Sequence, residues 1–230
     1  GNGHNIIIQT LVDAKANVNI RAYHGWSPLH EAAFCGHSDT VQLLVDAGAT
    51  VDGRDNNAWT PLHAAVQACR IEVLQVLLDA SASFATGGDF NTDSLLSAAA
   101  RGQISVLESL IEAKADVDAF YDVLRVSSLH LAAMCGHRGA VEMLLNAKAS
   151  IDVRTVDDEA PLDCAAQNGH IDVLKVLIDT KAPIDMNRQD GVTALHKAAE
   201  HGHCGAVQVL IEAKAPLNVR THWGASPMHR

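Results

Sequence analysis

Histidine and cysteine are the residue types in this chain that could bind a metal or take part in catalysis. Thirteen histidines and five cysteines occur among 230 residues, and imidazole and thiolate are both ligands of zinc. The densest local group is His201-Gly202-His203-Cys204. It lacks a second ligand pair at the spacing of a zinc finger, so we predict no metal site.

The chain contains none of the common catalytic or phosphate-binding motifs. G-x-x-x-x-G-K-S/T, G-x-G-x-x-G, G-x-S-x-G and H-E-x-x-H are all absent from the sequence, and each of them would indicate a specific chemistry. The adjacent acids Asp157-Asp158-Glu159 are expected at a solvated loop tip, where nothing apolar would perturb a pKa for acid–base work. We therefore predict that the chain is not an enzyme and binds no cofactor.

Nine histidines recur at two fixed places in a longer pattern. The leucine before the first of these places falls at positions 29, 62, 95, 129, 162 and 195, with Met228 in its place at the end, so the steps are 33 or 34 residues. Such a period marks an array of stacked repeats. Equivalent residues of neighbouring repeats lie about one helix diameter, roughly 10 Å, apart, too far for two histidines to share one ion. We expect all nine to serve the fold: His30, His63, His130, His196 and His229 at the first place, and His37, His137, His170 and His203 at the second.

Each repeat predicts two short helices. A Ser/Thr-Pro pair caps the first helix, because the hydroxyl accepts from free N–H groups and proline loses nothing in the first turn. Leu-x-x-Ala-Ala follows, and Gly-His ends the helix, as at Gly36-His37. A second helix carries apolar residues at i, i+3 and i+4, as in Val41, Leu44 and Val45.

This pattern closely resembles the ankyrin repeat family, whose unit is a β-turn plus two helices with a Thr-Pro-Leu-His-x-Ala signature. The resemblance covers essentially the whole chain and implies an all-α solenoid of stacked helix-turn-helix units with short β-hairpin fingers. It also implies that the first set of histidines ties neighbouring hairpins together. The expected repeats are 22–54, 55–87, a degenerate 88–121, 122–154, 155–187 and 188–220, flanked by a partial repeat at 1–21 and the start of another at 221–230. Because the chain begins and ends inside repeats, we expect it to be a section of a longer array.

Two departures from the family pattern stand out. Where ankyrin repeats usually have glycine after the second helix, the chain has Gly48 once, Ser81 once, and otherwise lysine at Lys15, Lys114, Lys148, Lys181 and Lys214. If that residue is left-handed, lysine costs up to about 1 kcal/mol relative to glycine. We interpret this row as neutral for binding. The region 86–127 matches the repeat least well and carries one extra residue between Phe120 and Val126, so we expect the array to be loosest or most specialised there.

The aromatic residues carry the main functional signal, because most of the few that occur fall in predicted fingers. Exposed tryptophan and tyrosine are typical of binding surfaces. Trp26 and Trp59 precede Ser/Thr-Pro, where packing on the hairpin is the stronger interpretation, whereas Tyr23, Tyr121 and Trp223 are the better contact candidates. Arginines near the fingers could meet an acidic partner or simply be solvated. The predicted protein-binding residues are Tyr23, His24, Trp26, Trp59, Phe90, Phe120, Tyr121, Arg154, Arg188, His222 and Trp223.

Composition narrows the class of partner. The net charge is −10, which disfavours nucleic acid and anionic membranes, and no apolar run approaches the roughly 20 residues of a membrane span. An odd number of cysteines without a C-x-x-C pair favours reduced thiols in an intracellular protein, and we expect the cytoplasm as its compartment. We expect a protein-binding scaffold or adaptor. Two alternatives stay open: a non-catalytic arm of a larger enzyme, channel or ubiquitin ligase, and a structural subunit of a large assembly. The resemblance also raises asparagine hydroxylation at Asn19 and Asn218.

Overall fold

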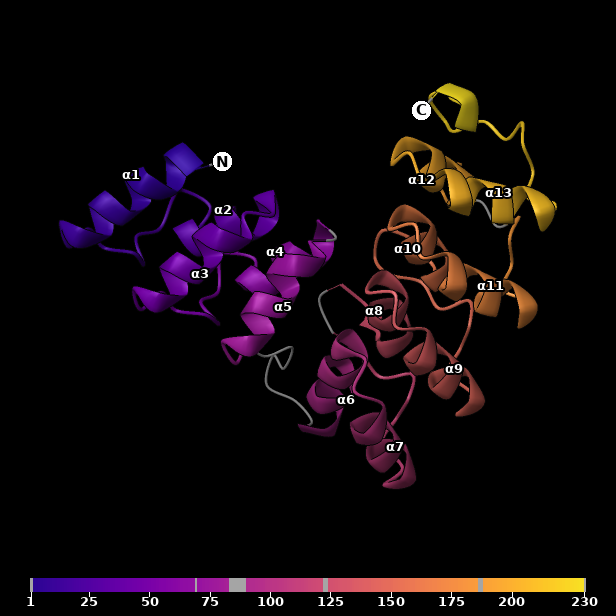
Figure 1. The fold of residues 1–230 in the computed structure, drawn as a ribbon, viewed down its shortest axis with the longest axis horizontal. Coiled ribbons are helices and arrows are strands. Elements are labelled where there is room, and N and C mark those ends of the chain that lie inside the picture. Colours follow the sequence, from indigo (N-terminus) through magenta and orange to yellow (C-terminus); the bar gives the residue numbers. More distant parts are fainter. Residues whose placement is uncertain (1, 69, 83–89, 122–123, 186–187, 230) are drawn as a thin grey trace. The chain divides into compact units, whose positions relative to one another are not determined.

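The computed structural model describes residues 2–68, 70–82, 90–121, 124–185 and 188–229, and about half of the chain forms short helices joined by turns (Figure 1). The chain divides into two compact units, residues 1–86 and 87–230. Each unit is a stack of helix pairs in two layers, so we describe each one separately.

The described residues of the first unit form five helices. They are α1 (Asn2–Asp13), α2 (Pro28–Cys35), α3 (Ser38–Asp46), α4 (Pro61–Gln67) and α5 (Ile71–Asp79). Helices α2 and α4 pack on one another in an inner layer, while α1, α3 and α5 pack successively in an outer layer. Each inner helix also packs on the outer helix that follows it in the chain.

The second unit, taken by itself, has the same kind of two-layer arrangement (Figure 1). Its elements are α6 (Phe90–Arg101), α7 (Ile104–Glu112), β1 (Phe120–Tyr121), β2 (Val126–Ser127), α8 (Ser128–Met134), α9 (Arg138–Asn146), α10 (Pro161–Gln167), α11 (Ile171–Asp179), α12 (Ala194–Glu200), α13 (Cys204–Glu212) and the 3-10 helix η1 (Pro227–His229). Helices α6, α8, α10 and α12 form the inner layer, and α7, α9, α11 and α13 form the outer layer.

The recurring leucine is the centre of the core in every repeat. Leu29, Leu62, Leu95, Leu129, Leu162 and Leu195 are all buried, and burying one leucine stabilises a fold by about 1.5–3 kcal/mol. The Ala-Ala pairs that follow are buried as well, for example Ala32 and Ala33. Small side chains there let neighbouring inner helices approach closely, which explains why the core needs so few aromatic rings.

The residue that ends each second helix is left-handed in every repeat. The φ angle is +84° at Gly48 and lies between +60° and +71° at Ser81 and the five lysines. The lysine row therefore occupies a conformation that glycine would adopt at lower cost, by about 1 kcal/mol. This strain is repeated along the stack.

The fingers are tight turns closed by backbone hydrogen bonds. Asp55 N donates to Trp59 O at 2.8 Å, and Thr155 N donates to Glu159 O at 3.0 Å. Within the described residues, strands occur only at residues 120–127, where β1 and β2 pair antiparallel with Phe120 opposite Ser127 and Tyr121 opposite Val126. Residues 83–89 and 122–123 of the region expected to be atypical lie outside the description.

Candidate partner-binding surface

Three histidines of the first set connect their repeat to the next finger. The Nε2 atoms of His30, His130 and His196 donate to the carbonyl oxygens of Trp59 (3.1 Å), Glu159 (3.0 Å) and Ala225 (3.3 Å). Their Nδ1 atoms accept from backbone N–H groups of Ser27, Ser127 and Thr193 at the helix starts. The implied role in tying hairpins together is thereby confirmed for these three residues.

Burial favours the neutral imidazole at His30, His63 and His130. It lowers the pKa of His63 and of His130 to about 4, and it lowers the pKa of His30 as well. A ring whose Nδ1 accepts and whose Nε2 donates has the neutral tautomer already fixed by its partners. Such histidines are structural groups and do not act as proton carriers near neutral pH.

The second set of histidines bonds backwards to the preceding repeat. The Nε2 atoms of His137, His170 and His203 donate to the oxygens of Ala100 (3.0 Å), Met134 (2.8 Å) and Gln167 (2.9 Å). Each acceptor is a backbone carbonyl in the last turn of an inner helix. The sequence indicated a structural role, but it did not reveal these acceptors.

Three of the predicted contact rings are exposed at finger tips. Tyr23 is 92% exposed and meets His24 edge-on, with ring centroids 5.2 Å apart. Trp223 is 74% exposed, and its neighbour His222 is exposed too. Phe120 is 42% exposed, with the Arg125 guanidinium 5.2 Å above its ring. Phe90 is the first residue of α6, and its side chain lies outside the described part.

Tyr121 is a correction to the sequence analysis. It is only 2% exposed, so the expectation that its ring is available to a partner is wrong. The physical reason is strand alternation: consecutive residues of β1 point to opposite faces, and Phe120 takes the outward position. The one-residue extension of this finger obscured the register in the sequence.

Trp26 and Trp59 pack on the helices that follow them, as the stronger interpretation held. The ring of Trp26 lies 5.6 Å from that of Phe34, and its Nε1 donates to Asp55 Oδ2 at 2.9 Å. Trp59 stacks on His63 with centroids 6.2 Å apart. Both tryptophans stay partly accessible, so they form the base of a surface whose outer edge is Tyr23.

Arg154 and Arg188 are largely committed inside the protein, contrary to their selection as contact residues. Arg154 Nη1 donates to Asp158 O at 2.8 Å and lies 3.7 Å from Asp163 Oδ2. The Arg188 side chain is 12% exposed, with Nη1 2.8 Å from Glu159 Oε1. Because both guanidinium groups have acceptors within the protein, neither needs a carboxylate from a partner.

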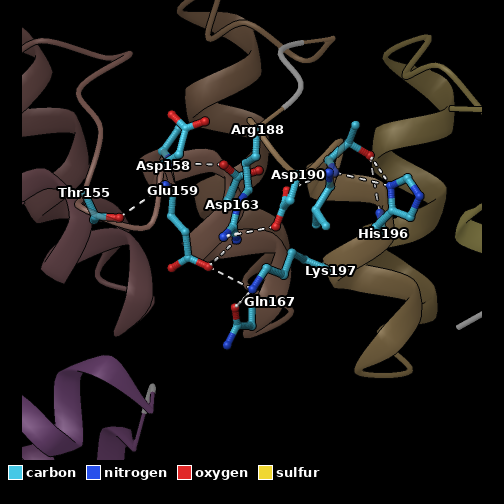
Figure 2. Close-up of polar contacts among 12 residues, drawn as sticks. Thr155, Asp158, Glu159, Asp163, Gln167, Arg188, Asp190, His196 and Lys197 are labelled. Carbon is cyan, nitrogen blue, oxygen red and sulfur yellow. Dashed lines mark hydrogen bonds and ion pairs between the residues drawn. The ribbon is translucent and has the colours of Figure 1, made fainter. Parts of the chain in front are cut away.

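A part-buried ionic network joins α10, α12 and the fingers before them (Figure 2). Glu159 Oε1 lies 2.8 Å from both Arg188 Nη1 and Lys197 Nζ, and Lys197 also donates to Gln167 Oε1 at 3.0 Å. Glu159 is therefore not part of a solvated acidic tip, which corrects the sequence analysis. It stands where the first unit has Trp26 and Trp59, so an ionic contact replaces an aromatic one in this repeat.

Asp163 replaces the recurring histidine in the same repeat. Its Oδ2 accepts a hydrogen bond from Ala160 N at 2.9 Å. In other repeats, the Nδ1 atom of the histidine accepts the equivalent bond from the backbone. Burial raises the pKa of Asp163 to about 6, although this backbone hydrogen bond and Arg154 act in the opposite direction. The sequence does contain a sign of this replacement, because Leu162-Asp163 stands where other repeats have Leu-His.

The asparagine position before each finger is also used within the fold. Asn19 Oδ1 accepts from Thr50 N at 2.8 Å, and Asp118 Oδ1 accepts from Ser150 N at 2.7 Å. These bonds join successive repeats. Hydroxylation at Asn19 or Asn218 stays a prediction that mass spectrometry can test by the mass of one added oxygen.

These contacts define a repeat protein. Its recurring histidines, capping residues and leucines hold the fold together, whereas the exposed side chains of the fingers differ from one repeat to the next. A family model described as ankyrin repeats, in three copies, matches residues 1–86, 95–190 and 162–230. The chain belongs to the ankyrin repeat family, and the predicted all-helical ankyrin fold is confirmed. No curated protein matches the chain. Among the helices of the described residues, none is long and apolar enough to cross a membrane.

Proposed function

We propose that this chain is a non-catalytic protein-recognition module that holds its partner through finger-tip side chains. Ankyrin repeats are in general protein–protein interaction modules. The observation that carries the proposal is the exposure of Tyr23 and Trp223 at the tips of fingers fixed by backbone bonds. Large rings presented on a rigid backbone bury much area while losing little conformational entropy. The odd number of cysteines supports an intracellular setting.

The test begins with a partner that co-purifies with the full-length protein. Its dissociation constant is then measured by calorimetry for the wild type, Tyr23→Ala and Trp223→Ala. We expect at least one ring to cost about tenfold or more in affinity, as for interface hot spots. Circular dichroism should stay unchanged, because neither ring is part of the core.

Lys175→Ala is the matched control. Lys175 is exposed on α11, in the outer layer, and its loss should leave the dissociation constant unchanged. Full affinity in both ring variants would refute the finger surface. A recognition arm of a larger enzyme, channel or ligase would use the same surface, so these variants test that alternative too.

A further inference from the structure

The finger at residues 188–192 is held to the preceding finger by carboxylates. Arg188 Nη1 lies 2.8 Å from Glu159 Oε1, and Gln189 N donates to Asp158 Oδ2 at 2.7 Å. Lys197 on α12 reaches the same Glu159 oxygen, also at 2.8 Å. We call these five residues the ionic joint (Figure 2). Each of these contacts ends on a negatively charged group.

Three other fingers make the corresponding backbone bond to a neutral carbonyl. The donors are Asn56 N, Val156 N and His222 N, and the acceptors are His24 O (3.2 Å), Leu124 O (3.0 Å) and Asp190 O (2.9 Å). Gln189 has the same place in its repeat as these donors, whereas its N–H donates to a carboxylate. A hydrogen bond to an ionised acceptor is about twice as strong as a neutral one, but its strength depends on the ions around it.

The histidine that ties other fingers to the helix before them is replaced at this joint. Elsewhere the donors to the carbonyl of the following finger are His30, His130 and His196. Asp163 stands at that place in the repeat before the finger 188–192, and an ionised carboxylate has no proton to donate. The bond that closes this finger, at 3.2 Å, is also longer than those of the fingers on either side, at 3.0 and 2.8 Å.

The finger 188–192 supports the next finger, which carries Trp223 at its tip. His222 N donates to Asp190 O at 2.9 Å. The two backbones also lie close together, because a Cβ atom built on Gly191 would be 2.8 Å from Arg220 O. A movement of the finger 188–192 would therefore remove part of the support beneath Trp223.

We propose that the finger 188–192 opens separately from the other fingers under the control of ionic strength, because the ionic joint takes the place of the histidine tie. Opening separates opposite charges, and dissolved ions stabilise separated charges while hardly affecting a neutral hydrogen bond. The side chains of Arg188 and Glu159 are 12% and 18% exposed, so the screening is moderate. A partner held by Trp223 would lose affinity as salt rises. This last consequence rests on the proposed function, whereas the opening itself does not.

Hydrogen–deuterium exchange of the whole chain, measured by mass spectrometry at pH 7, tests the opening. Between roughly 50 mM and 1 M sodium chloride, amide exchange in the finger 188–192 should rise about two- to fivefold relative to the finger 55–59. At low salt, Glu159→Gln should raise exchange in the finger 188–192 about tenfold or more, since Arg188 and Lys197 both lose their anion. Glu142→Gln, in the exposed pair with Arg138, is the control and should change neither finger.

Asp163→His combined with Ala160→Thr restores the histidine and the capping hydroxyl that other repeats have, so the salt dependence of the finger 188–192 should disappear. An equal salt response in both fingers, unchanged exchange in Glu159→Gln, or salt dependence that persists in the folded double variant would each overturn the proposal. If the double variant does not fold, the first two results decide alone. No partner takes part in these measurements, so their failure is separate from that of the proposed function, which fails if affinity survives both Tyr23→Ala and Trp223→Ala.

Discussion

The imidazole of His170 fills the space that a side chain on Gly136 would need. A Cβ atom built on Gly136 would lie 2.6 Å from His170 Nδ1, while His170 Nε2 donates to Met134 O at 2.8 Å. The same relationship joins Gly102 to His137 and Gly169 to His203. Glycine is thus favoured at position 136 for two reasons. Its φ of +76° is left-handed, and the imidazole of the next repeat leaves no space for a Cβ atom.

The first prediction concerns this contact. Gly136→Ala should lower the free energy of unfolding by about 1–3 kcal/mol, because the left-handed backbone and the displaced ring both cost energy. Gly202→Ala is the control, since Gly202 has the same backbone conformation but no atom within 4 Å of the added methyl. It should cost about 1 kcal/mol or less. Equal losses in urea unfolding would show that the ring contact contributes nothing.

The second prediction concerns the strained lysine row. Lys148→Gly should stabilise the chain by about 0.5–1 kcal/mol, because Lys148 has a φ of +71° after α9. Loss of a favourable charge near the helix end offsets a few tenths of a kcal/mol of this gain. In contrast, Lys175→Gly inside α11 should destabilise by about 1 kcal/mol. Thermal unfolding of the two variants should therefore shift in opposite directions.

The third prediction is a pH dependence from Asp163. Its pKa is 3.8 when unfolded and about 6 when folded, so the folded chain binds this proton more tightly. The resulting stabilisation is complete below pH 3.8 and is lost as the pH rises through 6. Relative to Asp163→Asn, which does not titrate, the wild type should lose about 2 kcal/mol between roughly pH 4.5 and 7.5.

The comparison with Asp163→Asn isolates one group, because the buried histidines are common to both chains. Burial lowers the pKa of His130 to about 4, so those residues destabilise the fold as the pH falls, in the opposite direction. Their effect cancels in the difference between the two unfolding curves. A flat difference for Asp163→Asn across this pH range would contradict the prediction.

The fourth prediction concerns the network around Glu159. Glu159→Gln keeps the shape but removes the charge shared by Arg188 and Lys197, whose side chains are 12% and 16% exposed. These side chains are part-buried, so the cost should lie between that of an exposed and a buried ion pair, at about 1–3 kcal/mol, because the partner charges remain largely desolvated. Urea unfolding measures the loss. Glu142→Gln, in the exposed pair with Arg138, should leave the unfolding curve unchanged.

The sequence predicted those features that depend on local, repeated chemistry. The leucine period located the core, and Ser/Thr before the histidines located the helix starts, because both signals act within a few residues. The bonds of His137, His170 and His203 were missed, since a backbone carbonyl acceptor leaves no trace in residue types. Tyr121 was assigned to the surface because a one-residue extension decides which side of β1 faces inward.

The Glu159 network escaped prediction for a different reason. Its members come from different places in successive repeats: Glu159 from one finger, Arg188 from the next, and Lys197 from α12. Read one repeat at a time, each looks like an ordinary charged surface residue. Only stacking brings them within 2.8 Å, so their pairing depends on the tertiary register between units.

The Gly-His contact has a consequence for how such a chain can lengthen. Each of these repeats carries both halves of the joint: Gly136 makes room for the ring that follows, and His137 reaches back to Ala100 O. A tandem duplication of one such segment of the gene would therefore insert a copy that already fits the repeats on both sides. Growth by copying needs no compensating mutation at this joint, which lets the finger residues diverge afterwards toward new partners.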